Sequence, residues 1–123
     1  MIQWFNVKER NGVASLYGNN ITLNTTAMYP LDFAYRVQVG IDEDKNIIIK
    51  PLSKNTVESG VLDECCLLKL EIHKSFARIS STILMKQISD ALGIELSKVP
   101  IQYETKWDSV ENVLIVNTKG GPR

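Results

Sequence analysis

The stretch NITLNTTAM at residues 20–28 has a counterpart in the second half of the chain, RISSTILMK at residues 78–86. Two shorter stretches repeat in the same order: VQV (37–39) matches IQY (101–103), and NIII (46–49) matches NVLI (112–115). These matches predict two similar units, at about 1–52 and 67–117, joined by a polar connector at 53–60. Hairpins with similar turns also produce such matches by chance, so duplication and chance similarity both stay open from sequence alone.

Each unit reads as a β-hairpin, a short helix and a second β-hairpin. The predicted fold class is therefore α+β, with one β-rich domain made of two β-hairpin/short-helix/β-hairpin halves. The chain has 123 residues, of which 44% are hydrophobic, so it has the size and composition to bury one core. Small β-units with exposed edges tend to pair with one another, so we expect a homodimer.

The charge and cysteine content narrow the class of protein. Fourteen basic residues balance fourteen acidic ones, and a neutral chain lacks the field that drives strong non-specific binding to nucleic acid. The only cysteines are the neighbours Cys65 and Cys66, which does not suit a disulfide-stapled secreted domain. No charged-then-apolar leader and no long apolar run is present. We therefore expect a soluble cytoplasmic protein that does not bind a membrane.

Turn residues divide the first unit into short strands. Asn11-Gly12 predicts a tight hairpin between strands at 4–7 and 13–17, because both central residues of such a turn must tolerate positive φ. The other elements predicted here are a turn at 18–20, a strand at 21–23, a short helix capped by Thr25 or Thr26 and running through Asp32, a strand at 34–39, a turn at 42–46, and a strand at 47–49, covered on both faces, that Pro51 ends.

The second unit contains the clearest helix, predicted at about 82–92. Its apolar residues recur every three to four positions, Ser81 is a suitable N-cap, and Gly93 is a suitable left-handed stop. The other elements predicted here are a strand at 68–72, a turn at Lys74-Ser75, a strand at 76–79, a hairpin of strands 101–104 and 113–116 around residues 106–109, and a frayed tail at 118–123.

No residue pattern in the sequence indicates catalysis or a cofactor. His73 is the only histidine and is predicted on the outward face of a strand, without the neighbours of a nucleophile triad. Asp63 and Glu64 should raise the pKa of the thiols of Cys65 and Cys66, which argues against a reactive cysteine. The sequence also lacks spaced metal ligands and a glycine-rich phosphate loop. We therefore expect a protein that is not an enzyme and that has no metal and no cofactor.

Residues 87–99 look like the core of a helix-turn-helix, with a first helix, a glycine turn and the start of a second helix. Pro100 argues against this interpretation because it removes a backbone donor and biases Val99 towards extended geometry. The second helix would end after about one turn, too early to lie in a major groove. A strand at 101–104 is the better prediction.

Residues 18–23, 37–42 and 46–51 together resemble the AbrB/MraZ swapped-hairpin family. That resemblance implies a strand, a short helix, a turn and a closing hairpin, often dimerised by interleaving, with two copies in one chain in MraZ-type members. It further implies binding to DNA through arginines around the first hairpin, where this chain has Lys8 and Arg10. The chain departs from the family at Asn24, where a proline is usual, and near Met28, where a basic residue is usual.

Two hypotheses for function remain. The first is a DNA-binding transcriptional regulator of swapped-hairpin type, and the second is a protein interaction or assembly module. Nucleic acid would be bound by exposed basic side chains. The candidates are Lys8, Arg10, Lys69, Lys74, Arg78 and Lys86. The alternative for these six residues is ordinary charged surface. A protein partner would instead dock on apolar residues such as Trp4, Phe5 and Trp107.

Overall fold

The computed structural model describes residues 1–5 and 11–123, and its regular elements all lie in the second range. In chain order they are β1 (Val13–Leu16), β2 (Asn20–Asn24), α1 (Thr25–Met28), η1 (Tyr29–Leu31), β3 (Arg36–Ile41), β4 (Ile47–Leu52), α2 (Lys54–Glu58), η2 (Glu64–Cys66), β5 (Glu71–Ile72), β6 (Phe76–Ser80), α3 (Thr82–Leu92), β7 (Ile101–Asp108) and β8 (Val113–Val116), where η marks a 3-10 helix.

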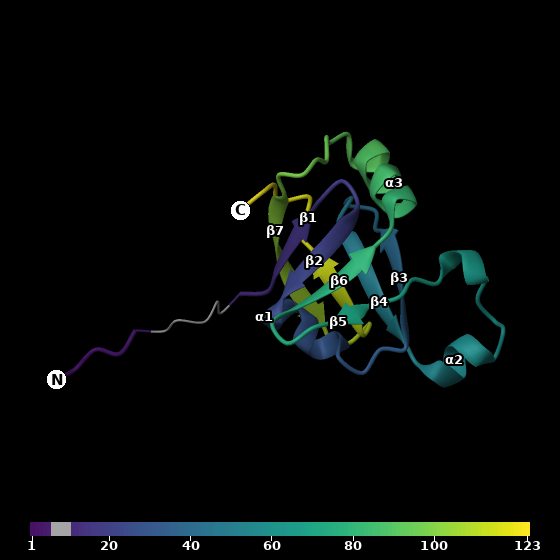
Figure 1. Ribbon diagram of the computed structural model, residues 1–123, viewed down its shortest axis with the longest axis horizontal. Helices are drawn as coiled ribbons and strands as arrows, with labels where there is room; N and C mark the ends of the chain where they lie inside the picture. Colours follow the sequence, from purple (N-terminus) through teal and green to yellow (C-terminus); the bar gives the residue numbers. More distant parts are fainter. Residues whose placement is uncertain (6–10) are drawn as a thin grey trace.

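The eight strands form one antiparallel sheet in the order β3-β4-β8-β7-β1-β2-β6-β5, and the sheet curls into a half-open barrel (Figure 1). The curl brings its two edges together at one point, where Val37 of β3 pairs with Leu68, just before β5. Two sets of four strands, β3-β4-β8-β7 and β1-β2-β6-β5, therefore meet twice. We call the β1–β7 junction the closed seam and the junction of β3 with Leu68 the open seam.

The inner face of the barrel holds a single apolar core. Alternate residues of each strand point inward, as in β2, where Ile21 and Leu23 are fully buried and their neighbours are half-buried. No charged or polar residue among those described is buried. The fully buried large side chains come from six strands, η1 and α3: Leu16, Ile21, Leu23, Leu31, Val37, Ile47, Ile49, Ile79, Met85, Leu114 and Val116.

Two helices cover the ends of the barrel, with α3 at one end and α1 at the other (Figure 1). Ser81 caps α3 by accepting a hydrogen bond from the Leu84 amide, and Gly93 ends it in the left-handed conformation. Met85 and Ile88 are the buried residues of α3. Both predicted ends of this helix, and its range of 82–92, are confirmed.

Several predictions for the first unit are wrong in detail. The cap of α1 is Asn24, which accepts a bond from the Ala27 amide, and not Thr25 or Thr26. Trp4 and Phe5 of the predicted strand at 4–7 form no strand, and residues 6 and 7 lie outside the described residues, whereas the second strand of that hairpin, predicted at 13–17, is observed as β1. Gly12 has no positive φ; instead it is buried, and a Cβ there would lie 2.2 Å from Thr105 Oγ1. Close packing, not a turn, requires this glycine.

Pro51 lies inside β4 and does not end it. Its partner across the ladder is Val37, whose amide and carbonyl both bond to Leu68 at 2.8 and 2.9 Å. The carbonyl of Val37 therefore needs no donor from residue 51, so the N–H that proline lacks removes no hydrogen bond from the β3–β4 ladder. The strand is also not covered on both faces, because Ile48 is half-exposed between the buried Ile47 and Ile49.

The rest of the chain differs from prediction in four places. The strand predicted at 68–72 is regular only as β5 at 71–72, and Leu68 forms an isolated bridge instead. The polar connector contains a helix, α2, which Ser53 caps. The β7–β8 turn lies at 109–112 rather than 106–109, because β7 continues to Asp108. The tail is held to the body of the protein: the Thr118 hydroxyl donates to the Lys45 carbonyl and the Arg123 amide to the Gln102 carbonyl.

Candidate functional site

The four described basic residues predicted to contact nucleic acid come from the segment around the β5–β6 hairpin and from α3. Lys8 and Arg10 lie outside the described residues, so that part of the prediction has no structural test. Lys69 and Lys74 are exposed on either side of β5, and Arg78 is half-buried on β6. Lys86 is exposed on α3, the helix that covers one end of the barrel.

Arg78 belongs to a compact cluster with three other residues of the β5–β6 hairpin. Its guanidinium carbon lies 5.1 Å from the centre of the Phe76 ring, and the ring of His73 stacks on Phe76 at 4.4 Å. Glu71 is the strand partner of Arg78, and its Oε2 lies 4.0 Å from His73 Nε2. The Glu71 carboxylate belongs to the same hairpin, and its negative charge makes the cluster a poor site for a phosphate group.

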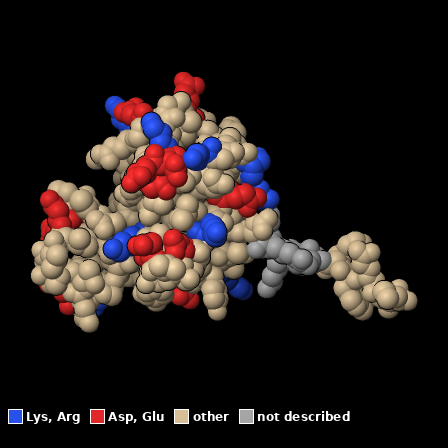
Figure 2. Space-filling view, turned by 180° about the vertical axis from the view of Figure 1, so that it is seen from behind, with Lys and Arg blue, Asp and Glu red and all other residues tan. Residues whose placement is uncertain are grey.

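The charged surface is mixed in sign. On the face drawn in Figure 2, lysines and arginines alternate with aspartates and glutamates, without a broad area of one sign. Ion pairs contribute to this mixing, such as Lys119 Nζ with Asp44 Oδ1 at 3.1 Å and Arg123 Nε with Glu104 Oε1 at 3.4 Å. Such a surface favours solubility over the capture of a polyanion.

The open seam is the place where the barrel lacks hydrogen bonds. Val37 points its amide and carbonyl away from β4, toward Leu68. Because these groups alternate in direction along a strand, the amides and carbonyls of Val39 and Ile41 point to the same side. Within residues 11–123, no strand pairs with this edge of β3 beyond Val37. The edge is therefore ready to accept an added strand.

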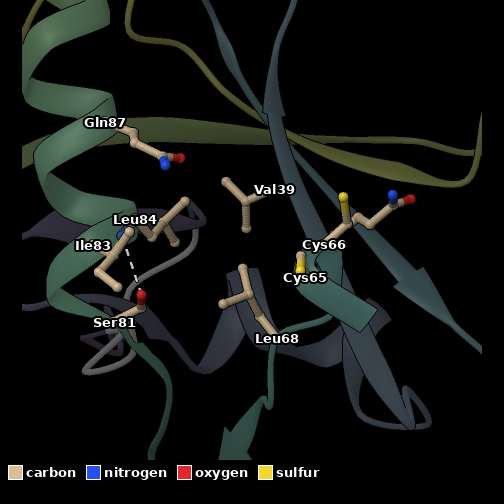
Figure 3. A pocket seen from close by; sticks show the side chains of 9 residues that line it. Val39, Cys65, Cys66, Leu68, Ser81, Ile83, Leu84 and Gln87 are labelled. Atoms are coloured by element: carbon tan, nitrogen blue, oxygen red, sulfur yellow. Dashed lines mark hydrogen bonds between the residues drawn. The ribbon is translucent and has the colours of Figure 1, made fainter. Parts of the chain in front are cut away.

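A cleft of about 220 Å³ lies beside this edge, between β3 and α3 (Figure 3). Leu84 and Gln87 of α3 face Val39 from one side, and Cys65, Cys66 and Leu68 close the other side. The remaining lining residues are Gln38, Ser81 and Ile83. None of the lining side chains is acidic or basic, so the cleft suits an uncharged segment and not an ion.

A short turn explains why the pairing with β3 does not extend from Leu68 toward Cys66. Residues 64–66 form η2, whose cap Asp63 accepts a hydrogen bond from the Cys65 amide at 3.0 Å. That bond lowers the pKa of the Asp63 carboxyl. The turn directs the backbone away from β3, where an extended chain would have continued the pairing from Leu68.

Sequence reasoning missed this cleft. The sequence predicts that Leu68, Leu70 and Ile72 face inward. The structure agrees for Leu70, which is buried, and for Leu68, which is half-buried, but the prediction is wrong for Ile72, which is 43% exposed at the end of the short edge strand β5. From sequence, Cys65 and Cys66 are candidates only for catalysis or metal binding. In the structure both are exposed, and both line the wall of the cleft. A usable signal was the abrupt start of the alternation at Leu68, which indicates a strand shorter than its partner.

Comparison of the chain with protein-family models, with curated proteins and with solved structures finds no match. Among the described residues, no helix is both long enough and apolar enough to cross a membrane. The same residues contain no group of three or more histidine, cysteine, aspartate or glutamate side chains placed to hold a metal ion. Two surfaces therefore remain as candidates, the β5–β6 cluster around Arg78 and the cleft at the open seam.

Proposed function

We propose that the chain is a non-catalytic interaction module that binds an extended peptide segment along the open seam. The observation that carries the proposal is the edge of β3, where the Val39 and Ile41 backbone groups have no strand partner within residues 11–123 and where Val39 borders an uncharged cleft. A segment lying there would bond to these groups as an added strand, and its alternate side chains would enter the cleft between Val39 and Leu84.

The structure also indicates which peptides fit. The lining is mostly apolar, with amides and a hydroxyl at Gln38, Gln87 and Ser81. A bound segment would therefore carry large apolar side chains at alternate positions and no charge on that face, because a buried unpaired charge is costly. Backbone bonds supply affinity for any such segment, and the cleft selects the side chain.

The test is selection of peptides from a random heptapeptide library, followed by NMR of the labelled protein with each synthesised peptide. We expect alternating apolar peptides that protect the Val39 and Ile41 amides from exchange.

Methylation of the peptide nitrogens that face β3 should abolish binding, since it removes the added donors. Val39→Pro should abolish binding as well, whereas Val39→Ala, which keeps the backbone donor, should weaken it less. Selected peptides that bind equally well when methylated would overturn the proposal.

A second candidate function, the DNA-binding regulator of swapped-hairpin type, is favoured by the strand order. The β1–β2 hairpin lies between β7 and β6, and the β3–β4 hairpin lies between β8 and Leu68. Each hairpin of one predicted unit thus sits between strands of the other. Such interleaving is what the resemblance to the AbrB/MraZ family implies, and it supports the division of the chain into two similar halves.

The strand register also supports this division, in an alignment shifted from the sequence matches. Ala14 pairs with Tyr103 across the closed seam, and Leu68 pairs with Val37 across the open seam. If Ala14 in the first half corresponds to Leu68 in the second, and Val37 in the first half corresponds to Tyr103 in the second, then exchanging the two halves turns one pair into the other. Both of these residues are buried, whereas Ile101, the sequence match of Val37, is half-buried.

Titration of the protein with DNA at several salt concentrations tests the second candidate. Phosphate contacts release counterions, so a regulator should bind less tightly as salt rises. The double variant Arg78→Gln/Lys86→Gln tests the described basic residues, and unchanged affinity would dismiss them as contacts. Absence of binding even at low salt would dismiss the regulator, while leaving the peptide-binding proposal intact.

A further inference from the structure

The segment Met1–Phe5 exposes more apolar surface than any other stretch of similar length among the described residues. Its exposed fractions are 70% at Ile2, 83% at Trp4 and 88% at Phe5. Each aromatic side chain can bury about 150–250 Å² in an interface. Large apolar groups that are this exposed mark a segment that gains free energy by docking.

The composition of this segment matches the requirements of the open-seam cleft. In an extended segment, Ile2 and Trp4 project to one face and Gln3 to the other. The residues MIQWF contain no charged side chain, and the cleft lining contains none either. A cavity of about 150 Å³ already accepts a benzene ring, so the 220 Å³ cleft has room for one aromatic side chain.

The arrangement of the barrel indicates that the cleft receives this segment from another molecule. Figure 1 shows Met1–Phe5 extending away from the barrel, on the side opposite β3 and the turn at 64–66. Ile83 at the cleft is 74% exposed, so within one chain the cleft stays open to solvent.

We infer that two copies of the chain exchange these segments, each adding its segment as a strand on the other's β3, with Trp4 in the open-seam cleft and Ile2 beside it. The inference rests on the proposed peptide binding and names its occupant. Exchange in both directions uses the same two surfaces on each copy and gives a closed homodimer. Because neither the segment nor the cleft lining has a charged side chain, the association should depend little on salt.

Sedimentation of the full chain over a range of concentrations tests the inference. We expect a dimer that Trp4→Ala weakens by about 30-fold or more, the effect of losing a buried aromatic anchor. Phe33→Ala is the matched control, since Phe33 is 67% exposed and lies outside both the segment and the cleft. It should leave the dimer unchanged. Trp4 makes no core contact, so its removal should not affect folding.

Cys65 and Cys66 provide a second measurement, because they are the only thiols and line the cleft. Their labelling by a maleimide should slow as protein concentration rises, and Trp4→Ala should remove that dependence. Addition of a synthetic MIQWF peptide to the Trp4→Ala chain should restore protection of the Val39 amide.

Three outcomes would overturn the inference: a monomer at all concentrations, a dimer that Trp4→Ala leaves intact, or protection of the cleft that is independent of concentration. The failure of the inference is distinguishable from failure of the proposed function. If library peptides still bind along β3 while the Trp4→Ala dimer is unchanged, only the occupant is wrong. If no peptide protects Val39, peptide binding itself is wrong.

Discussion

The two seams join the same two sets of four strands but do so very differently. The closed seam has four register pairs, from Val13 with Glu104 to Leu16 with Ile101, whereas the open seam has the single pair of Val37 with Leu68. The closed seam is packed on its inner side by Leu16 and Tyr103, which are buried. The open seam borders a cleft instead. The comparison indicates that the closed seam holds the two sets of strands together. At the open seam, the edge of β3 beyond Val37 has no strand partner within residues 11–123.

The largest difference should appear in amide hydrogen exchange. The Thr105 amide bonds to the Gly12 carbonyl, and alternation along the strands then makes Ala14 and Tyr103 a hydrogen-bonded pair across the closed seam. Their amides should exchange only on global unfolding, whereas the Val39 amide should exchange at least about a thousandfold faster. NMR exchange rates of the Trp4→Ala chain measure this, because that variant lacks the side chain inferred to occupy the cleft. Equal rates would remove the distinction between the seams.

Truncation of one leucine at each seam gives the next largest effect. Leu16→Ala should destabilise the protein by about 3 kcal/mol, because Leu16 is fully buried and leaves a cavity. Leu68→Ala should cost about 1 kcal/mol, because Leu68 is half-buried and borders the cleft. Urea unfolding of the two variants measures the contrast. A loss at Leu68 as large as that at Leu16 would mean that both seams carry the stability of the barrel.

The parts of the fold that the sequence predicts correctly are those that depend on local signals. The range of α3 is correct because its signals are local: Ser81 and Gly93 mark its ends, and its apolar residues recur with the helical period. The turns at 18–20, 42–46 and 74–75 are predicted for the same reason. Each depends on residues that are neighbours in the chain.

The cleft depends on pairings between distant residues, and these are what sequence reasoning missed. Whether Pro51 ends a strand depends on what Val37 bonds to, and Val37 bonds to Leu68. Turn chemistry likewise gives a reason for Gly12 that is wrong, since its neighbour is Thr105 on another strand. Charge and the family resemblance indicate the basic site residues, but neither reveals that Arg78 lies over the Phe76 ring and is the strand partner of Glu71.

A pair of glycines tests how tightly the two sets of strands approach each other. A Cβ on Gly12, beside the closed seam, would lie 2.2 Å from Thr105 Oγ1 and 3.2 Å from the Ala27 Cα. Gly12→Ala should therefore destabilise the protein by about 2 kcal/mol through overpacking. Gly40→Ala on β3 is the control, because a Cβ there meets nothing within 4 Å. It should leave the stability within about 0.5 kcal/mol of the original or raise it slightly. Thermal unfolding that ranks the two variants the other way would contradict this description of the closed seam.

The smallest effect concerns Asp63, which caps the turn that stops strand pairing at the open seam. The bond from the Cys65 amide lowers the pKa of the Asp63 carboxyl in the folded protein. A lowered folded-state pKa means that the carboxylate's contribution is fully present above about pH 4 and is lost as the pH falls through the lower folded value. The Cys65 amide resonance should then shift with a midpoint below that of an unperturbed aspartate. Asp63→Asn should remove this pH-dependent shift of the Cys65 amide resonance. The amides at the closed seam should stay as protected from exchange as before. A midpoint at or above the ordinary value would show that Asp63 does not hold the turn, and the early end of strand pairing at Leu68 would need another cause.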